Sequence, residues 1–248
     1  MCSRFAGGWR KFLLLFLFCL GCLSCGIEDY IYLNPVSSIS MTLVNTATIR
    51  LPGNAETYFT HFIIYYRIYV SDEISESVTT SNMSNINSSM NSDYNTLYSY
   101  VSNDDIISTN IGSVFSNRGY YEIQIDGADI EDFLDSGSRG RTLTINFPQD
   151  SQGNPDLSID GGTAYPLLRS SVLQDPRPIN SRHFLNVQGL YDASNSTNNG
   201  DVQQKSQYTS SDRYTYAAMY IVASGIDDNY SPIYSRPAYI GVFRLPQQ

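Results

Sequence analysis

The sequence predicts an all-β protein, an antiparallel β-sandwich with long loop insertions and at most one or two short helices. Several segments alternate apolar and polar residues with a period of two, which is the pattern of half-buried strands. The chain also contains 20 tyrosines, set among many Ser, Asn and Thr residues, a composition typical of strands joined by polar loops. Evidence for helices is confined to two short stretches.

The clearest strand is predicted at residues 62–70, where aromatic or branched side chains occupy both faces. Such a strand belongs in the centre of a sheet, with at least one face fully covered. An earlier strand ends at the turn formed by Pro52, Gly53 and Asn54. In chain order, the predicted strands span residues 47–51, 62–70, 121–125, 143–147, 216–223 and 239–243.

Two short helices are predicted, at residues 93–101 and 129–134, the second with Asp126 or Asp129 as its N-cap. The polar stretches 71–93 and 192–212 are predicted to be long surface loops or insertions. The chain is therefore divided into a signal peptide (1–24), a tether and N-terminal segment (25–45), and one sandwich domain (46–248) carrying insertions around 71–93 and 192–212.

The first 24 residues have the features of an export signal. Arg4, Arg10 and Lys11 form a basic region ahead of an apolar run at residues 12–20. That run is too short to cross a bilayer, which takes ~20 residues, but it suits the apolar core of a signal peptide, ~7–15 residues long. All four cysteines lie in or just after this leader, at Cys2, Cys19, Cys22 and Cys25.

A small residue followed by cysteine occurs twice at the end of the leader, at Cys22 and at Cys25. This pattern resembles the lipobox of bacterial lipoproteins. The resemblance implies that the cysteine carries fatty acyl groups such as palmitate, becomes the first mature residue and holds the protein on a membrane of the bacterial cell envelope, at the outer membrane or the periplasmic face. We assign lipid attachment to Cys25, which leaves a short region after the apolar run, with Cys22 as the alternative. The other interpretation is an ordinary signal peptide or an uncleaved anchor with incidental cysteines.

The C-terminal residues 214–246 resemble the last hairpin of a fibronectin type III domain. Alternating apolar residues end at Ala223, a turn follows at Gly225, and a Ser-rich return begins at Ser231. Residues 62–72 resemble the third strand of that family, which implies a fibronectin type III or immunoglobulin-like sandwich. The lipobox, the Tyr-rich strands and the Asn/Ser-rich loops together resemble uncharacterised lipoproteins of spirochaetes, which implies an envelope location and no known reaction.

Composition narrows the possible partners of the body. It contains no cysteine after Cys25, which excludes disulfides and thiolate sites there. The net charge of the chain is −9, and it falls to −12 without the three basic residues of the leader. An acidic body with scattered Lys and Arg argues against a nucleic-acid partner. The expected partners are a membrane, through the lipid, and an unknown protein or glycan.

No pattern of residues predicts a catalytic site. The two histidines, His61 and His183, are interpreted as strand-edge and surface residues, because no motif places a nucleophile beside either one. We therefore assign no catalytic residue and expect no cofactor.

Two acidic groups are candidates for calcium, which takes ~6–8 oxygen ligands, but the fixed spacing of a calcium loop is absent and no metal site is assigned. Their members are Asp126, Asp129, Glu131, Asp132 and Asp135 in one group, and Asp150, Asn154 and Asp156 around Gly153 in the other. Five strand tyrosines are interpreted as residues packed between sheets rather than as binding residues, namely Tyr65, Tyr66, Tyr69, Tyr216 and Tyr220.

The function expected from these observations is that of a lipid-anchored cell-envelope protein with a non-enzymatic binding, adhesion or structural role. The alternative is a carbohydrate-active protein, either a binding module or a hydrolase, that holds its substrate with exposed tyrosines and acidic loop residues.

Overall fold

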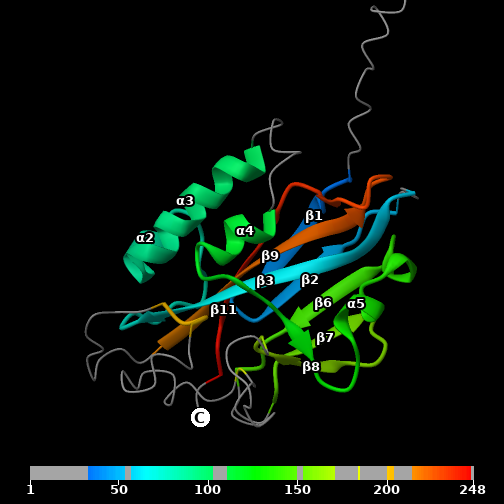
Figure 1. The fold of residues 1–248 in the computed structure, drawn as a ribbon. Coiled ribbons are helices and arrows are strands. Elements are labelled where there is room, and N and C mark those ends of the chain that lie inside the picture. The colour runs from blue at the N-terminus through cyan, green and yellow to red at the C-terminus, as the bar shows by residue number, and fades with distance from the viewer. Residues whose placement is uncertain are drawn as a thin grey trace, which may run out of the picture. The chain divides into compact units, whose positions relative to one another are not determined.

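The predicted mainly β fold is confirmed by the computed structural model, which describes residues 33–53, 57–102, 111–149, 153–170, 184, 200–203 and 214–246. Within them, eleven strands form two antiparallel sheets, accompanied by four α-helices and a short 3-10 helix. The sheets pack face to face around an apolar core, which makes the body a β-sandwich (Figure 1).

The first sheet has six strands. In spatial order they are β1 (Ser38–Thr42), β2 (Thr46–Arg50), β6 (Thr142–Asn146), β7 (Asp156–Ile159), β8 (Tyr165–Leu168) and β5 (Gln124–Ile125). In β2 and β6 the alternation predicted from the sequence directs one face inward, and Ile49 lies opposite Leu143 in the buried layer. β1 falls within residues 25–45, where the sequence predicted a tether and N-terminal segment, and β7 and β8 were not predicted either.

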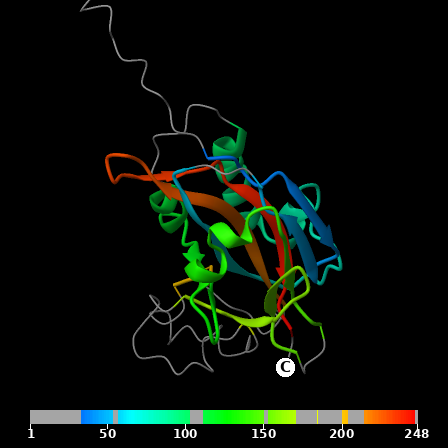
Figure 2. The same cartoon turned by 90° about the vertical axis from the view of Figure 1, so that its right-hand side faces the viewer.

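The second sheet is built around two long central strands. β3 (Phe59–Ser71) and β9 (Tyr214–Ile226) have 13 residues each and pair along nearly their whole length. β4 (Tyr121–Glu122) pairs with β3, while β10 (Pro232–Tyr234) and β11 (Ala238–Arg244) both return along β9. The predicted C-terminal hairpin is therefore present, and its turn protrudes from the sheet (Figure 2).

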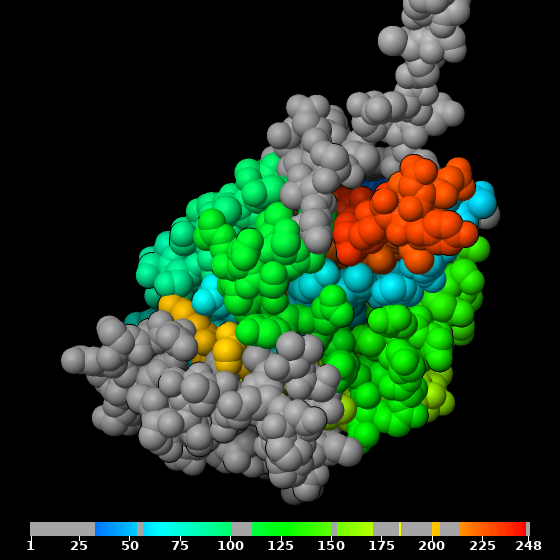
Figure 3. Space-filling view, viewed as in Figure 1, coloured from blue at the N-terminus to red at the C-terminus, as the bar shows by residue number. Residues whose placement is uncertain are grey.

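Both faces of β3 are covered, which explains why both are rich in apolar side chains. Phe62, Ile64 and Ile68 point into the core between the two sheets. Tyr65 and Tyr69 point the other way, into a second apolar cluster beneath the helices. Three helices supply that cover, α2 (Met83–Ile86), α3 (Ser88–Ser102) and α4 (Ile111–Ser116), and α3 and α4 form neighbouring green patches on the surface in Figure 3.

The helix content exceeds the one or two short helices expected. The predicted helix at 93–101 is part of α3, and the one at 129–134 is α5 (Ile130–Phe133), with Asp129 as its N-cap. Of the two alternatives for 71–93, a surface loop or an insertion, the loop was wrong, because α2 and the start of α3 occupy much of this stretch. Met83, Ile86 and Met90 are buried against the sheet, and this packing stabilises helices whose many Ser and Asn residues have weak helix propensity.

One edge of β3 is divided among several short segments. Leu134 accepts a backbone hydrogen bond from Phe62, β4 pairs at Tyr65 and Tyr66, and residues 201–203 pair in parallel at Ile68. The last of these segments lies within residues 192–212, so the predicted loop there contributes to the sheet at this point.

Candidate functional site

A cleft of about 340 Å³ opens beside α5 and the turn that joins β7 to β8. This volume falls in the ~300–1,000 Å³ range of small-molecule sites. Its walls carry two carboxylates, two aromatic rings, a guanidinium and hydroxyls, among them groups of Asp132, Asp135, Phe133, Tyr165, Arg141 and Thr163. We call it the β7–β8 cleft.

One wall of the cleft is held by local caps on its own backbone. The Asp129 carboxylate accepts a hydrogen bond of 2.9 Å from the Glu131 amide at the start of α5. Asp135 accepts one of 2.7 Å from the Gly137 amide at the start of the 3-10 helix Ser136–Ser138. Between these caps, Leu134 is fully buried and accepts a hydrogen bond from β3, so this wall is fastened to the second sheet.

The opposite wall is the tight turn after β7. Asp160 and Gly161 both have positive φ angles, 49° and 68°, as Asp-Gly favours at the centre of a type I′ turn, and the Gly162 amide donates to the Ile159 carbonyl at 2.9 Å to close this turn within the longer β7–β8 connection. The Asp160 carboxylate accepts hydrogen bonds of 2.8 Å each from Arg141 Nε and from the Thr142 amide. These bonds, the one from Arg141 above all, lower the pKa of Asp160 below its ordinary value, and they tie the turn to β6.

The two walls meet through an aromatic pair. The rings of Phe133 and Tyr165 lie 5.1 Å apart, edge to face at 69°, a favoured geometry for aromatic pairs. Both side chains are only partly buried and pack on the core between the sheets. The cleft thus combines partly exposed ring surface with ionic groups.

Asp132 is the carboxylate of the cleft that is available to a ligand. Among the described residues it forms no hydrogen bond or ion pair, and its side chain is exposed. Arg141, by contrast, already shares its charge with Asp160. The arrangement therefore suits binding of a polar ligand through hydrogen bonds to carboxylate oxygens together with contact on a ring.

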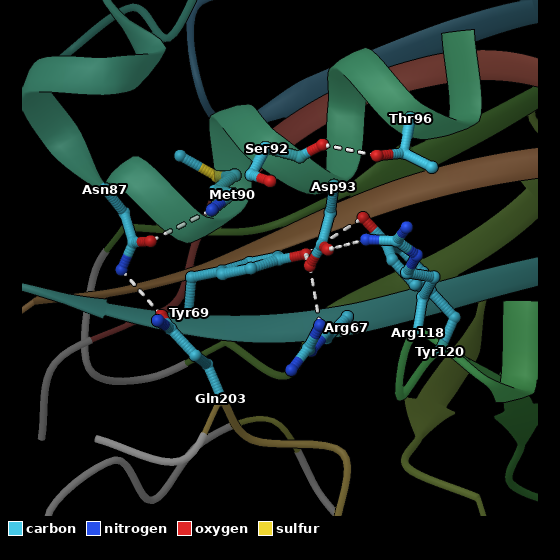
Figure 4. A network of polar contacts seen from close by, with 10 residues as sticks. All are labelled: Arg67, Tyr69, Asn87, Met90, Ser92, Asp93, Thr96, Arg118, Tyr120 and Gln203. Carbon is cyan, nitrogen blue, oxygen red and sulfur yellow. Dashed lines mark hydrogen bonds and ion pairs between the residues drawn. The ribbon is translucent and has the colours of Figure 1, made fainter. Parts of the chain in front are cut away.

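A second polar cluster lies under α3, centred on Asp93 (Figure 4). Its Oδ2 accepts hydrogen bonds from Arg67 Nη1 at 2.5 Å and from the Tyr69 hydroxyl at 2.6 Å, and its Oδ1 faces Arg118 Nη1 at 3.4 Å. The Tyr69 and Tyr120 hydroxyls are 3.1 Å apart. Burial, and then the charge of Asp93, raise the pKa of Tyr69 well above its ordinary value. Only 8% of the Asp93 side chain is exposed, so we interpret this cluster as a fastening between α3 and β3.

A third cluster is fully buried and joins β8 to β3. Arg169 donates to the Asp201 carboxylate from Nε at 2.6 Å and from Nη2 at 2.5 Å, and the Tyr66 hydroxyl donates to it at 2.8 Å. Burial alone would lower the pKa of Arg169, but the hydrogen bonds and charge of Asp201 outweigh it and leave that pKa raised. This pair holds residues 201–203 against the sheet.

Within the described residues, the structure does not bring the candidate residues from the sequence analysis together in one site. Cys25, Cys22, His183 and Asp150 lie outside the described residues. His61 is near the start of β3, where its Nδ1 is 3.1 Å from Thr60 Oγ1. The remaining acidic candidates divide by role: Asp129 and Asp135 are backbone caps, Asp132 lines the cleft, and Asp156 begins β7 with a pKa that burial raises.

The described residues also bear on metal binding and on the positions of the strand tyrosines. In the described part of the chain, no three His, Cys, Asp or Glu side chains gather in a group suited to a metal ion. All five strand tyrosines are buried. The prediction that they pack between the sheets is confirmed for Tyr66 and wrong for Tyr65, Tyr69, Tyr216 and Tyr220, which pack under the helices.

The sequence analysis missed the cleft itself and the buried Arg169–Asp201 pair. The Asp160-Gly161 turn was the signal that could have located one wall of the cleft. No helix in the described ranges combines the length and apolar character needed to cross a bilayer. Comparisons with protein-family models, curated proteins and solved structures yield no match to this chain.

Proposed function

We propose that the protein is a lipid-anchored component of a bacterial cell envelope with a non-enzymatic role in binding. The observation that carries the proposal is the leader, in which a basic region and a short apolar run precede Ser24 and Cys25. A single acyl chain holds a protein on a membrane only marginally, whereas two or more hold it durably. Lipid on Cys25, or alternatively on Cys22, would tether the body without a spanning helix.

The arrangement of the β7–β8 cleft supports binding as the role of the tethered body. The backbone of its walls is fixed by caps and by the Asp160 turn, so a ligand would meet a cleft whose shape is already formed, and such preorganisation lowers the cost of association. One carboxylate oxygen of Asp135 accepts a hydrogen bond from the Gly137 amide, which holds the Asp135 side chain in a fixed position in the cleft wall. Adhesion and structural support by the same tethered sandwich are the other non-enzymatic roles included in this proposal.

The anchor is tested by labelling the full chain with radioactive palmitate in a diderm bacterial host. We expect Cys25→Ser to abolish incorporation, and the matched variant Cys22→Ser to retain it. The reverse result would move the lipid to Cys22. Incorporation unaffected by either change, or absent from the wild type, would overturn the proposal.

A further inference from the structure

We infer that the β7–β8 cleft binds a neutral saccharide. The inference rests on the proposed binding role and names the chemical class of the ligand. It is carried by the coincidence, in one cleft, of an exposed carboxylate, a fixed guanidinium and partly exposed aromatic rings.

The aromatic pair supplies the apolar contact that a sugar ring needs. A pyranose has an apolar face of C–H groups surrounded by hydroxyls, and placing that face on an aromatic ring removes both surfaces from water. Tyr165 and Phe133 meet edge to face, 5.1 Å apart. Because the rings are held at an angle, a ligand in the cleft would contact the face of one ring and the edge of the other.

The polar groups of the cleft include both hydrogen-bond acceptors and donors, as the hydroxyls of a sugar require. A sugar hydroxyl donates one hydrogen bond and accepts others, while an ionised carboxylate only accepts and a guanidinium only donates. Asp132 and Asp135 can therefore accept from hydroxyls, and Arg141 and Thr163 can donate to them. Hydrogen bonds to charged groups are about twice as strong as those between neutral groups.

The charge of the cleft selects against anionic ligands. Arg141 is paired with Asp160 at 2.8 Å, so the charges of Asp132 and Asp135 are not balanced by it. The whole chain carries a net charge of −9, which further disfavours phosphate, sulfate or carboxylate groups. A cationic peptide would meet the same carboxylates, but it would also meet the Arg141 guanidinium, which a neutral ligand can use as a donor.

The inference is tested with the full, detergent-solubilised chain on an array of neutral glycans, followed by calorimetry with the best free glycan. Asp132→Asn is the principal variant, because its side chain makes no contact on which the fold depends. Glu131→Gln is the matched control, since Glu131 is an exposed neighbour outside the cleft lining. Thr163→Val removes one hydroxyl at nearly constant shape.

We expect binding of at least one neutral glycan, weakened at least about tenfold by Asp132→Asn and changed less than about twofold by Glu131→Gln. Thr163→Val should weaken it by a smaller factor. No binding to any neutral glycan, equal binding by Asp132→Asn, or binding of a polylysine probe in place of glycans would each overturn the inference. Palmitate labelling of the same preparation keeps the outcomes separate, because a labelled protein that binds no glycan refutes the saccharide alone.

Discussion

Replacing Asp201 by Asn tests the importance of the buried pair between β8 and β3. The Asp201 side chain is 0% exposed and that of Arg169 is 2% exposed, so neither charge is solvated once the other is lost. Asn keeps the size of Asp but presents one amide nitrogen, a donor, where the carboxylate accepted hydrogen bonds. One of the three contacts from Arg169 and Tyr66 must then place a donor against a donor.

The magnitude follows from the loss of the Asp201 charge beside the buried Arg169 guanidinium. Breaking a fully buried ion pair by neutralising one partner costs about 3–5 kcal/mol, because the other charge stays buried without its opposite charge at the same contact. That is a large share of a typical stability of ~5–15 kcal/mol. Neutralising both groups with Arg169→Met and Asp201→Asn should recover about 1–3 kcal/mol, because no charge then remains buried.

The assay is urea unfolding followed by far-ultraviolet circular dichroism. Glu76→Gln is the control, since it makes the same acid-to-amide change in the ion pair with Arg244, where the Glu76 side chain is 63% exposed; its cost should be below about 1 kcal/mol. A loss of less than about 1 kcal/mol in Asp201→Asn, or simple additivity in the double variant, would refute the reasoning.

Three further changes probe the fold. Gly225→Ala should lower the stability by about 1–3 kcal/mol in urea unfolding, because a Cβ there would lie 2.2 Å from the Tyr58 carbonyl oxygen; unchanged stability would mean that β9 can shift. Asp129→Ala should cost about 0.5–2 kcal/mol through loss of the α5 cap, and Asp129→Asn, which keeps an acceptor, should cost less. Stability should hold up to pH 10 and fall above it by about 1.4 kcal/mol per pH unit for each buried tyrosine whose folded pKa is raised, because the unfolded chain releases those protons first; a flat profile from pH 9 to 11.5 would contradict this. These tyrosines include Tyr66, Tyr69, Tyr120 and Tyr220, whose pKa values burial raises well above the ordinary value.

The long central strands could be predicted because their sequence pattern matches their burial. In β3 and β9 apolar residues occupy both faces over 13 positions, and both faces are covered. β7 and β8 have only four residues each, and three consecutive residues of β7 are buried, so no alternation identifies them. Whether a segment this short forms a strand depends mainly on its packing against neighbouring strands.

The helices over the second sheet had a signal that polar composition concealed. Met90 and Leu97 are seven residues apart in α3, which places them on one helical face, and Met83 and Ile86 are three residues apart in α2. Asp93 lies between Met90 and Leu97 on the same face of α3, and its charge breaks the apolar pattern. In the structure, that carboxylate is buried because Arg67 and Tyr69 donate to it.

The cleft could not be derived from the sequence, because its parts meet only through tertiary pairing. Asp132 and Tyr165 are 33 positions apart. They come together because β5, which leads into α5, pairs with β8. The sequence identified the acidic residues, but it left open which carboxylate would lack a hydrogen-bond partner among the described residues and so be available to a ligand.

The divided edge of β3 has a consequence for how copies of the protein meet at high concentration. A long uninterrupted edge offers a continuous row of amides and carbonyls to which a strand of a neighbouring copy can add. Here Leu134, β4 and residues 201–203 each occupy a separate stretch of that edge. Copies of the protein that meet at high concentration therefore find no single template along β3, and the fold limits sheet-to-sheet aggregation from that side.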